Sequence, residues 1–208
     1  MDSRTRIVKE GYDAIADEYM DWIGRIAGDP RRQWADTLTS RLPDRARVLE
    51  LGCGAGIPET KLLAQRFQVT AVDISTEQLE RARMNVPSAA FIQADFTALE
   101  LEPESFEAVA AFYSFNHVPR DLLGTLFARI HSWLVPGGLL LASLGTSDTD
   151  DSTEAWLGTT MFFSSFPPET NRRLLSKAGF ELLLDELVTM HEPEPDGKAT
   201  VQWVLCRR

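Results

Sequence analysis

Short apolar runs alternate with segments of helical periodicity through most of the 208-residue chain. Helical spacing of apolar side chains predicts helices over residues 60–67, 76–84 and 121–134. Short apolar strands that alternate with helices are typical of a parallel sheet that is covered on both faces. We therefore predict a doubly wound α/β domain. Its strands are expected at residues 47–51, 68–72, 90–93, 106–111 and 139–144.

The C-terminal part continues this pattern in a different way. A helix is predicted over residues 168–178, closed by Gly179. Two strands over 180–190 and 200–205, joined by the polar turn 191–198, are expected to form an antiparallel hairpin at the sheet edge.

Two segments lie outside the alternation. Residues 1–46 are mostly helical and amphipathic, and residues 145–167 are rich in aromatic side chains. Ligands bind at the carboxyl ends of the strands in open α/β sheets, and we expect both segments to fold over that edge. The chain is thus predicted to be one domain, 1–208, with a helical lid (1–46) and a cap insertion (145–167).

Composition narrows the function classes. The chain has 44% hydrophobic and 25% charged residues, and its net charge of −10 repels nucleic acid and anionic lipid at long range. Its N-terminus lacks the apolar region of a secretory signal, and it has no apolar run that would span a membrane. Cys53 and Cys206 lie far apart without metal-ligand spacing. We expect a cytoplasmic protein with no metal site and no nucleic-acid or membrane partner, a monomer or homodimer.

The most informative motif is VLELGCGAG at residues 48–56, where a strand runs into a glycine loop and then a helix. Glycines allow close backbone approach to a ligand, and a helix N-terminus supplies free N–H groups. A tight turn with a purely structural role is the alternative interpretation of the motif.

Acidic residues at strand ends indicate an adenosine ligand. Asp73 ends the second predicted strand, where a carboxylate binds both hydroxyls of a ribose. Asp95 ends the third, placed to accept from an exocyclic amine, and Ile74 and Phe96 are placed to flank a flat base. Taken singly, the two aspartates also suit turn or cap positions.

Glu50 distinguishes between adenosine ligands. It lies two residues before the first glycine, where a carboxylate would repel a pyrophosphate but would hold the ammonium of an aminoacyl group. The glycine spacing is GxGxG, not the GxGxxG of dinucleotide-binding folds. The predicted ligand is S-adenosylmethionine in preference to NAD.

From about residue 9 to residue 208 the sequence resembles the class I S-adenosylmethionine-dependent methyltransferases. The motifs are VLELGCGAG, VTAVDIS, FIQADF, and FEAVAAFYSFNHVP followed by LFARIHSWLVPGGLLLAS. The resemblance implies a Rossmann-like seven-stranded sheet in the order 3-2-1-4-5-7-6, with the last strand antiparallel. Within this family, the sequence is most similar to the small-molecule methyltransferases of bacterial secondary metabolism and to the UbiE-like group. In those enzymes a YDxxAxxY helix covers the cofactor, and here residues 12–19 read YDAIADEY.

The resemblance also implies roles for single residues. Glu50 would bind the cofactor's amino group, Asp73 its ribose and Asp95 its adenine amine. The remaining cofactor contacts would be Gly52, Gly54 and Gly56 under the aminoacyl chain, Ile74 and Phe96 beside the adenine, the backbone of Phe112 near the sulfur, and Tyr12 and Tyr19 from the lid. Core packing is the alternative for the two tyrosines.

Catalysis is less determined, because the sulfonium already activates the methyl group and positioning supplies much of the rate. His117, after the fourth strand, is the candidate general base, with a structural bond to a backbone group as the alternative. An acceptor wall is expected at Trp156, Met161, Phe162 and Phe163, with core packing as the alternative. No [DN]PP[YF] motif follows the fourth strand, which argues against methylation of adenine or protein amides.

The sequence therefore predicts a methyltransferase that acts on a small hydrophobic or aromatic acceptor and releases S-adenosylhomocysteine. The alternatives are a cyclase or pericyclase that binds S-adenosylmethionine, a non-catalytic methyltransferase-like protein, and an NAD-dependent oxidoreductase.

Overall fold

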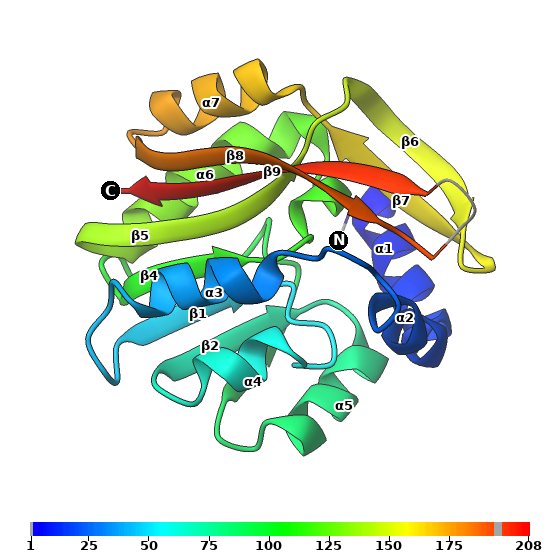
Figure 1. Cartoon of the computed structure of the whole chain (residues 1–208), viewed down its shortest axis with the longest axis horizontal. Coiled ribbons are helices and arrows are strands. Elements are labelled where there is room, and N and C mark those ends of the chain that lie inside the picture. Colours follow the sequence, from blue (N-terminus) through cyan, green and yellow to red (C-terminus); the bar gives the residue numbers. More distant parts are fainter. Residues whose placement is uncertain (1, 194–196) are drawn as a thin grey trace.

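The computed structural model describes residues 2–193 and 197–208, and its centre is a seven-stranded sheet (Figure 1). The strands run in the order β3-β2-β1-β4-β5-β9-β8. The first five are parallel, and β9 pairs antiparallel with both neighbours. Their bounds are β1 (Arg47–Leu51), β2 (Gln68–Asp73), β3 (Ala90–Gln93), β4 (Phe106–Ala111), β5 (Leu134–Gly145), β8 (Glu181–His191) and β9 (Lys198–Arg207).

This order confirms the predicted fold. Strands β6 (Thr149–Trp156) and β7 (Thr159–Ser165) form a separate two-stranded sheet, so β8 and β9 are the sixth and seventh strands of the main sheet. They form the expected antiparallel pair at the edge. Of the predicted turn 191–198, residues 194–196 lie outside the described residues.

Alternation along the central strands divides the interior into two cores. Leu49 and Leu51 of β1 face one core, while Val48 faces the other. Helices α6 (Arg120–Trp133) and α7 (Pro168–Lys177) cover the first core. Helices α3 (Arg31–Thr39), α4 (Glu59–Leu63) and α5 (Thr76–Asn85) cover the second. Because both sheet faces are buried, the strands read as nearly continuous apolar runs.

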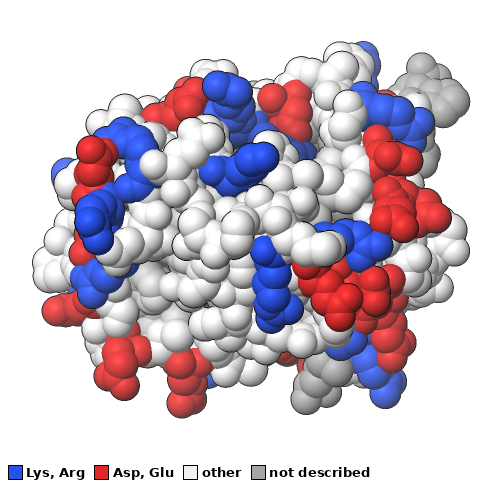
Figure 2. All heavy atoms as spheres, turned by 90° about the horizontal axis from the view of Figure 1, so that it is seen from below, with Lys and Arg blue, Asp and Glu red and all other residues white. Residues whose placement is uncertain are grey.

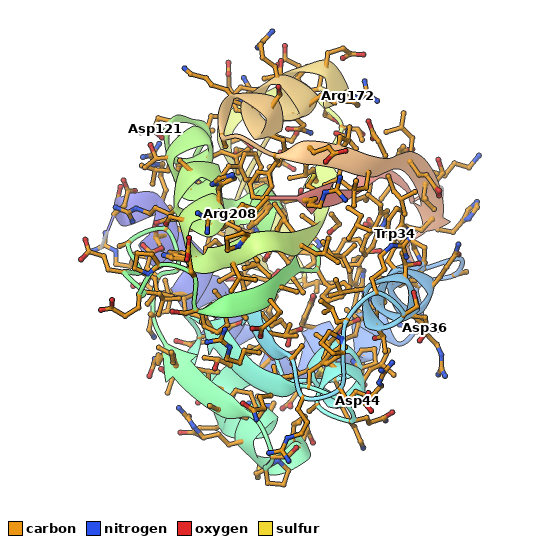
Figure 3. All side chains as sticks on the ribbon, turned by 90° about the vertical axis from the view of Figure 1, so that its left-hand side faces the viewer. Trp34, Asp36, Asp44, Asp121, Arg172 and Arg208 are labelled. Atoms are coloured by element: carbon orange, nitrogen blue, oxygen red, sulfur yellow. The ribbon has the colours of Figure 1, made fainter. Side chains whose placement is uncertain are left out.

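Helix α3 belongs to the layer on the sheet, although it falls within the segment predicted as a lid. Trp34 is 3% exposed and stacks on Trp203 of β9, with ring centroids 5.5 Å apart. Figure 3 shows Trp34 and Asp36 on this helix, and Asp36 is exposed. The helices that lie over the strand ends are α1 (Ser3–Ala14) and α2 (Ala16–Ile23).

The start of α5 differs from a full capping box, in which the Gln78 side chain would accept from the N–H of Ser75. Ser75 Oγ accepts from the backbone N–H of Gln78 at 3.1 Å. The N–H of Ser75 donates to Asp73 Oδ1 instead of to the Gln78 side chain, and the buried Gln78 amide has no partner. Asp73 thus replaces half of the capping box.

Polar contacts anchor α1 and the β6–β7 hairpin to the helices that cover the sheet, and α1 and α2 together are called the lid below. Asp13 of α1 accepts hydrogen bonds from Ser75 Oγ (2.7 Å) and from the N–H of Glu77 (3.2 Å) at the start of α5. Arg120 at the start of α6 pairs with Asp148 and Asp150, which precede or begin the β6–β7 hairpin. These ion pairs tie the start of the β6–β7 hairpin to α6.

Charges of both signs are mixed on the surface. On the face in Figure 2, Lys and Arg side chains are interspersed with Asp and Glu. None of the helices in the described ranges, 2–193 and 197–208, has the length and apolarity needed to cross a bilayer.

Candidate functional site

A first cavity lies at the carboxyl ends of β1, β2 and β4, beneath the lid helices. All but one of the predicted cofactor contacts line it: Tyr12, Tyr19, Glu50, Gly52, Gly54, Asp73, Ile74, Asp95, Phe96 and Phe112. The exception is Gly56. A Cβ there would lie 3.2 Å from Val86 and 3.3 Å from Ala82, so this glycine serves the packing of the loop on α5.

The glycine loop brings backbone against the end of the sheet. Gly52 and Gly54 have φ values of +77° and +52°, which side chains rarely adopt. A Cβ on Gly52 would lie 2.4 Å from Cβ of Ser114. The N–H of Gly54 donates to Asp73 Oδ2 at 2.7 Å, which ties the loop to β2. Both glycines are therefore required by geometry.

Glu50 is the most unusual group in this cavity. It is 1% exposed, and its Oε2 has no hydrogen-bond partner. Burial raises the pKa of Glu50 to about 8, and the nearby carboxylates of Glu59 and Asp73 add to this effect. Buried polar atoms are nearly always satisfied, so an unpartnered carboxylate oxygen on a cavity wall indicates a cationic ligand. An ammonium group fits this position.

The two aspartates lie as the sequence predicts. Asp73 is 8% exposed and accepts backbone N–H groups on both oxygens, which fixes its orientation, while burial raises its pKa. Asp95 Oδ1 accepts from the N–H of Thr97 at 2.9 Å and from its Oγ1 at 2.6 Å. Ile74 and Phe96 follow these residues and line the same cavity.

Arg31 is a site residue that sequence reasoning missed. It is 8% exposed, pairs with Asp29 at 2.5 Å and Glu59 at 3.0 Å, and stacks on the ring of Tyr113 at 4.8 Å. Its position at the start of an amphipathic helix gave no signal of burial. Together with Asp73, the two partners of Arg31 give three carboxylates against one guanidinium, so the cavity favours a ligand with net positive charge, and a bound cation would also favour the charged form of Glu50.

A second cavity of about 570 Å³ lies between the lid, the β6–β7 hairpin and strands β8 and β9. One part of its lining is aromatic, and another is formed by hydroxyl and amide groups. The aromatic residues are Tyr12, Tyr19, Trp22, Tyr113, Trp156 and Phe163, and the polar ones include Asn116, Thr146, Ser147, Ser164 and Thr200. The Trp156 ring contacts the rings of Tyr12, Tyr19, Trp22 and Phe163 at centroid distances of 5.4–6.0 Å.

Of the four residues predicted to form an acceptor wall, two line the second cavity and two do not. Trp156 and Phe163 line the second cavity. Met161 and Phe162 are 0% and 1% exposed and line neither cavity, because α1 covers them in a small core of their own. For these two residues the packing alternative describes their placement.

The two cavities meet at residues that line both of them: Tyr12, Tyr19, Arg31, Tyr113 and His117. His117 Nε2 lies 2.9 Å from the Tyr12 hydroxyl, and Nδ1 lies 2.8 Å from the carbonyl oxygen of Phe162. Burial lowers the pKa of His117 to about 4. The predicted base is thus at the junction, and it also bonds a backbone group, in β7 of the hairpin.

Comparisons with known proteins relate part of the sequence to methyltransferases. Residues 48–138 match a family described as a methyltransferase domain. A putative methyltransferase, YqeM of Bacillus subtilis (strain 168), is 29% identical over 147 residues, covering 68% of this chain and 57% of that protein. The trans-aconitate 2-methyltransferase of Paracidovorax citrulli (strain AAC00-1) is 38% identical over 129 residues, covering 58% and 48%. The chain therefore spans about half the length of these curated relatives.

A solved structure extends the likeness to nearly the whole chain. The 1,6-didemethyltoxoflavin-N1-methyltransferase of Burkholderia thailandensis, with bound 1,6-didemethyltoxoflavin and S-adenosylhomocysteine, superposes with a TM-score of 0.73 at 22% identity. The match covers 98% of this chain and 88% of that one. The family match includes the glycine loop and the strand ends of the first cavity, and the sheet order is the one this family implies. Residues 48–138 are thus similar to methyltransferase domains, and the chain as a whole has the fold of this methyltransferase structure.

Proposed function

We propose that this protein transfers the methyl group of S-adenosylmethionine to a small, flat, aromatic acceptor. The observation that carries the proposal is the junction of two unlike cavities, one acidic and one aromatic, at Tyr12 and His117. A methyl donor in the first cavity and an acceptor in the second would meet there. Methyl transfer needs this in-line approach more than it needs an additional chemical group.

The lining of the first cavity offers a partner for each polar group of the cofactor. S-adenosylmethionine carries an ammonium, a sulfonium and a carboxylate, and so has a net positive charge in an acidic cavity. Glu50 would bind the ammonium and Arg31 the carboxylate, as the buried anion and the buried cation of the lining. Asp73 would hold the ribose hydroxyls, Asp95 the adenine amine, and Ile74 and Phe96 the faces of the base. When bound, the cofactor supplies an activated methyl group.

The second cavity supports the acceptor class. Its volume of about 570 Å³ lies within the range of roughly 300–1,000 Å³ that is typical of small-molecule sites. Aromatic rings on one side suit a flat ring, and hydroxyl and amide groups elsewhere suit polar substituents at its edge. Of the two cationic side chains in the described lining, Arg31 is assigned to the cofactor's carboxylate and Lys198 is exposed, which disfavours an acceptor with several carboxylates.

Isothermal titration with S-adenosylmethionine and S-adenosylhomocysteine tests the proposal. We expect micromolar binding of both, at least tenfold weaker in Glu50→Gln, which keeps the shape of the side chain and removes its charge. Mass spectrometry of a panel of phenols and N–H heterocycles then detects methyl transfer. Failure of the parent protein to bind either compound would contradict the proposed function.

A further inference from the structure

The tautomer of His117 is determined by the group that faces it. Its Nδ1 lies 2.8 Å from the carbonyl oxygen of Phe162, and a carbonyl oxygen only accepts hydrogen bonds. Nδ1 therefore carries the hydrogen. Because burial lowers the pKa of His117 to about 4, the ring is neutral near pH 7, and its other nitrogen, Nε2, is an acceptor.

This tautomer determines in turn how the Tyr12 hydroxyl is oriented. The hydroxyl lies 2.9 Å from Nε2 of His117, and since Nε2 accepts, Tyr12 donates its hydrogen to the histidine. Burial raises the pKa of Tyr12 well above its ordinary value, so the phenol stays protonated. With its single hydrogen engaged, the Tyr12 oxygen offers only lone pairs to any further partner.

Tyr12 is held where these lone pairs matter. It lines both cavities, and its ring makes edge contacts with Tyr19 and Trp156 at centroid distances of 5.1 Å and 6.0 Å. Asp13, the next residue, anchors the same helix to the start of α5 through Ser75 Oγ at 2.7 Å. The oxygen of Tyr12 therefore stands at the junction of the cavities, where the proposed function places the acceptor.

We propose that the Tyr12 oxygen accepts a hydrogen bond from the very atom that is methylated, and that His117 is a positioning residue that acts through Tyr12. The proposal rests on the proposed function and narrows its substrate class. The methylated atom must carry a hydrogen, as in a phenol, an alcohol or an N–H heterocycle, whereas a tertiary amine or a thioether lacks the donor that Tyr12 requires. The hydrogen bond would orient that atom toward the first cavity. As its bond to the methyl carbon forms and the carbon–sulfur bond of the sulfonium breaks, its proton would pass to the Tyr12 oxygen, and the hydrogen of Tyr12 would move to Nε2 of His117.

The first test reads the histidine directly. Ring ¹H–¹⁵N correlation spectra of the ¹⁵N-labelled protein contain three histidines, and His117→Gln assigns one of them. We expect His117 in the Nδ1–H tautomer, with an Nε2 resonance that shifts in Tyr12→Phe. Tyr19→Phe, which removes the neighbouring hydroxyl, is the matched control and is expected to leave that resonance in place. An Nε2–H tautomer would overturn the proposal, because Tyr12 would then accept from His117.

The second test reads specificity with two probes of nearly equal shape. 2-Naphthol carries an O–H donor and 2-methoxynaphthalene does not, and each is titrated into the S-adenosylhomocysteine complex. We expect the parent to bind 2-naphthol at least tenfold more tightly, and Tyr12→Phe to bind both alike. His117→Gln is expected to reduce the preference without removing the ring of Tyr12. Equal binding of both probes by the parent, or an undiminished preference in Tyr12→Phe, would overturn the assignment of Tyr12.

The affinity for S-adenosylhomocysteine separates this proposal from the proposed function. If the parent does not bind S-adenosylhomocysteine, the proposed function fails. If the parent and Tyr12→Phe bind it alike and show the same probe preference, only the role of Tyr12 fails. Thermal melting of each variant distinguishes a lost contact from a lost fold.

Discussion

The two cavities share a boundary but are built in opposite ways. The first is formed mainly by loops that follow β1 to β4, which are adjacent parallel strands, and it contains buried carboxylates. The second is formed by the lid, the β6–β7 hairpin and strands β8 and β9, which lie far apart in the sequence, and it is aromatic and roomy. A sheet edge holds loops in fixed register, whereas a hairpin and a lid differ easily between proteins. We therefore expect the cofactor site to be similar among related proteins and the acceptor site to differ between them.

Two glycines offer the sharpest way to separate the cavities. A Cβ at Gly52 or at Gly145 would lie 2.4 Å from a serine Cβ, that of Ser114 or of Ser165. Gly52 also has a φ of +77°. We expect Gly52→Ala to weaken binding of S-adenosylhomocysteine at least a hundredfold, because the loop must move. Gly145→Ala, which disturbs only the second cavity, should change that affinity less than threefold. Equal losses in both variants would show that the cavities are not independent.

The ionised form of Glu50 is predicted to lower the free energy of unfolding. Its pKa is about 8 in the folded protein against 4.5 as the ordinary value, so the folded state holds the proton more tightly. The stability contributed by neutral Glu50 is thus present below pH 4.5 and is lost as pH rises through 8. We expect Glu50→Gln to bind the cofactor poorly. Between pH 5 and pH 8, its free energy of unfolding should fall by roughly 3 kcal/mol less than that of the parent. Urea unfolding without ligand, at both pH values, measures this. Parallel pH profiles for the two proteins would contradict it.

Trp156 tests the aromatic side of the comparison. Its ring contacts four aromatic rings of the second cavity, those of Tyr12, Tyr19, Trp22 and Phe163, and does not line the first cavity. We expect Trp156→Ala to cost about 1–3 kcal/mol of unfolding free energy through lost packing. Binding of 2-naphthol to the S-adenosylhomocysteine complex should weaken about tenfold, a change of ~1.4 kcal/mol. Affinity for S-adenosylhomocysteine itself should stay within threefold, and a larger loss would mean that Trp156 supports the first cavity through the lid.

The smallest expected effect concerns the ion pairs that tie the β6–β7 hairpin to α6. Arg120 pairs with Asp148 and Asp150, whose side chains are 73% and 96% exposed, so each ion pair is screened by water. We expect Arg120→Gln to lower the unfolding free energy by about 1 kcal/mol or less. Amide exchange should nevertheless accelerate in β6 and remain unchanged in β1. Unaltered exchange in β6 would show that packing of Met161 and Phe162 under α1 holds the hairpin in place without the ion pairs of Arg120.

Local patterns were sufficient for most of the fold. The periods of apolar residues placed β1, β3 and β4 at their observed bounds, and the resemblance implied the sheet order that the structure has. The clustering of the candidate cofactor residues was predictable for a related reason. Glu50, Asp73 and Asp95 lie at or just after the ends of strands, and adjacent parallel strands bring such ends together.

Other features depend on contacts that no local pattern contains. Arg31 is buried because Asp29 and Glu59 pair with it, and Gly56 is a packing position because Val86 and Ala82 lie against it. Met161 and Phe162 are covered by α1, whereas Phe163 of the same strand faces the second cavity. The sequence marks all three as apolar and cannot say which wall each will meet.

The sequence alone determined that the glycines and terminal carboxylates of β1 to β4 would gather at one edge of the sheet, because strand register carries local order directly into space. Only the tertiary structure decided what His117 does. Its two partners, Tyr12 and the carbonyl of Phe162, lie 105 and 45 residues away, and they meet it only after the lid and the hairpin have packed on the same edge of the sheet.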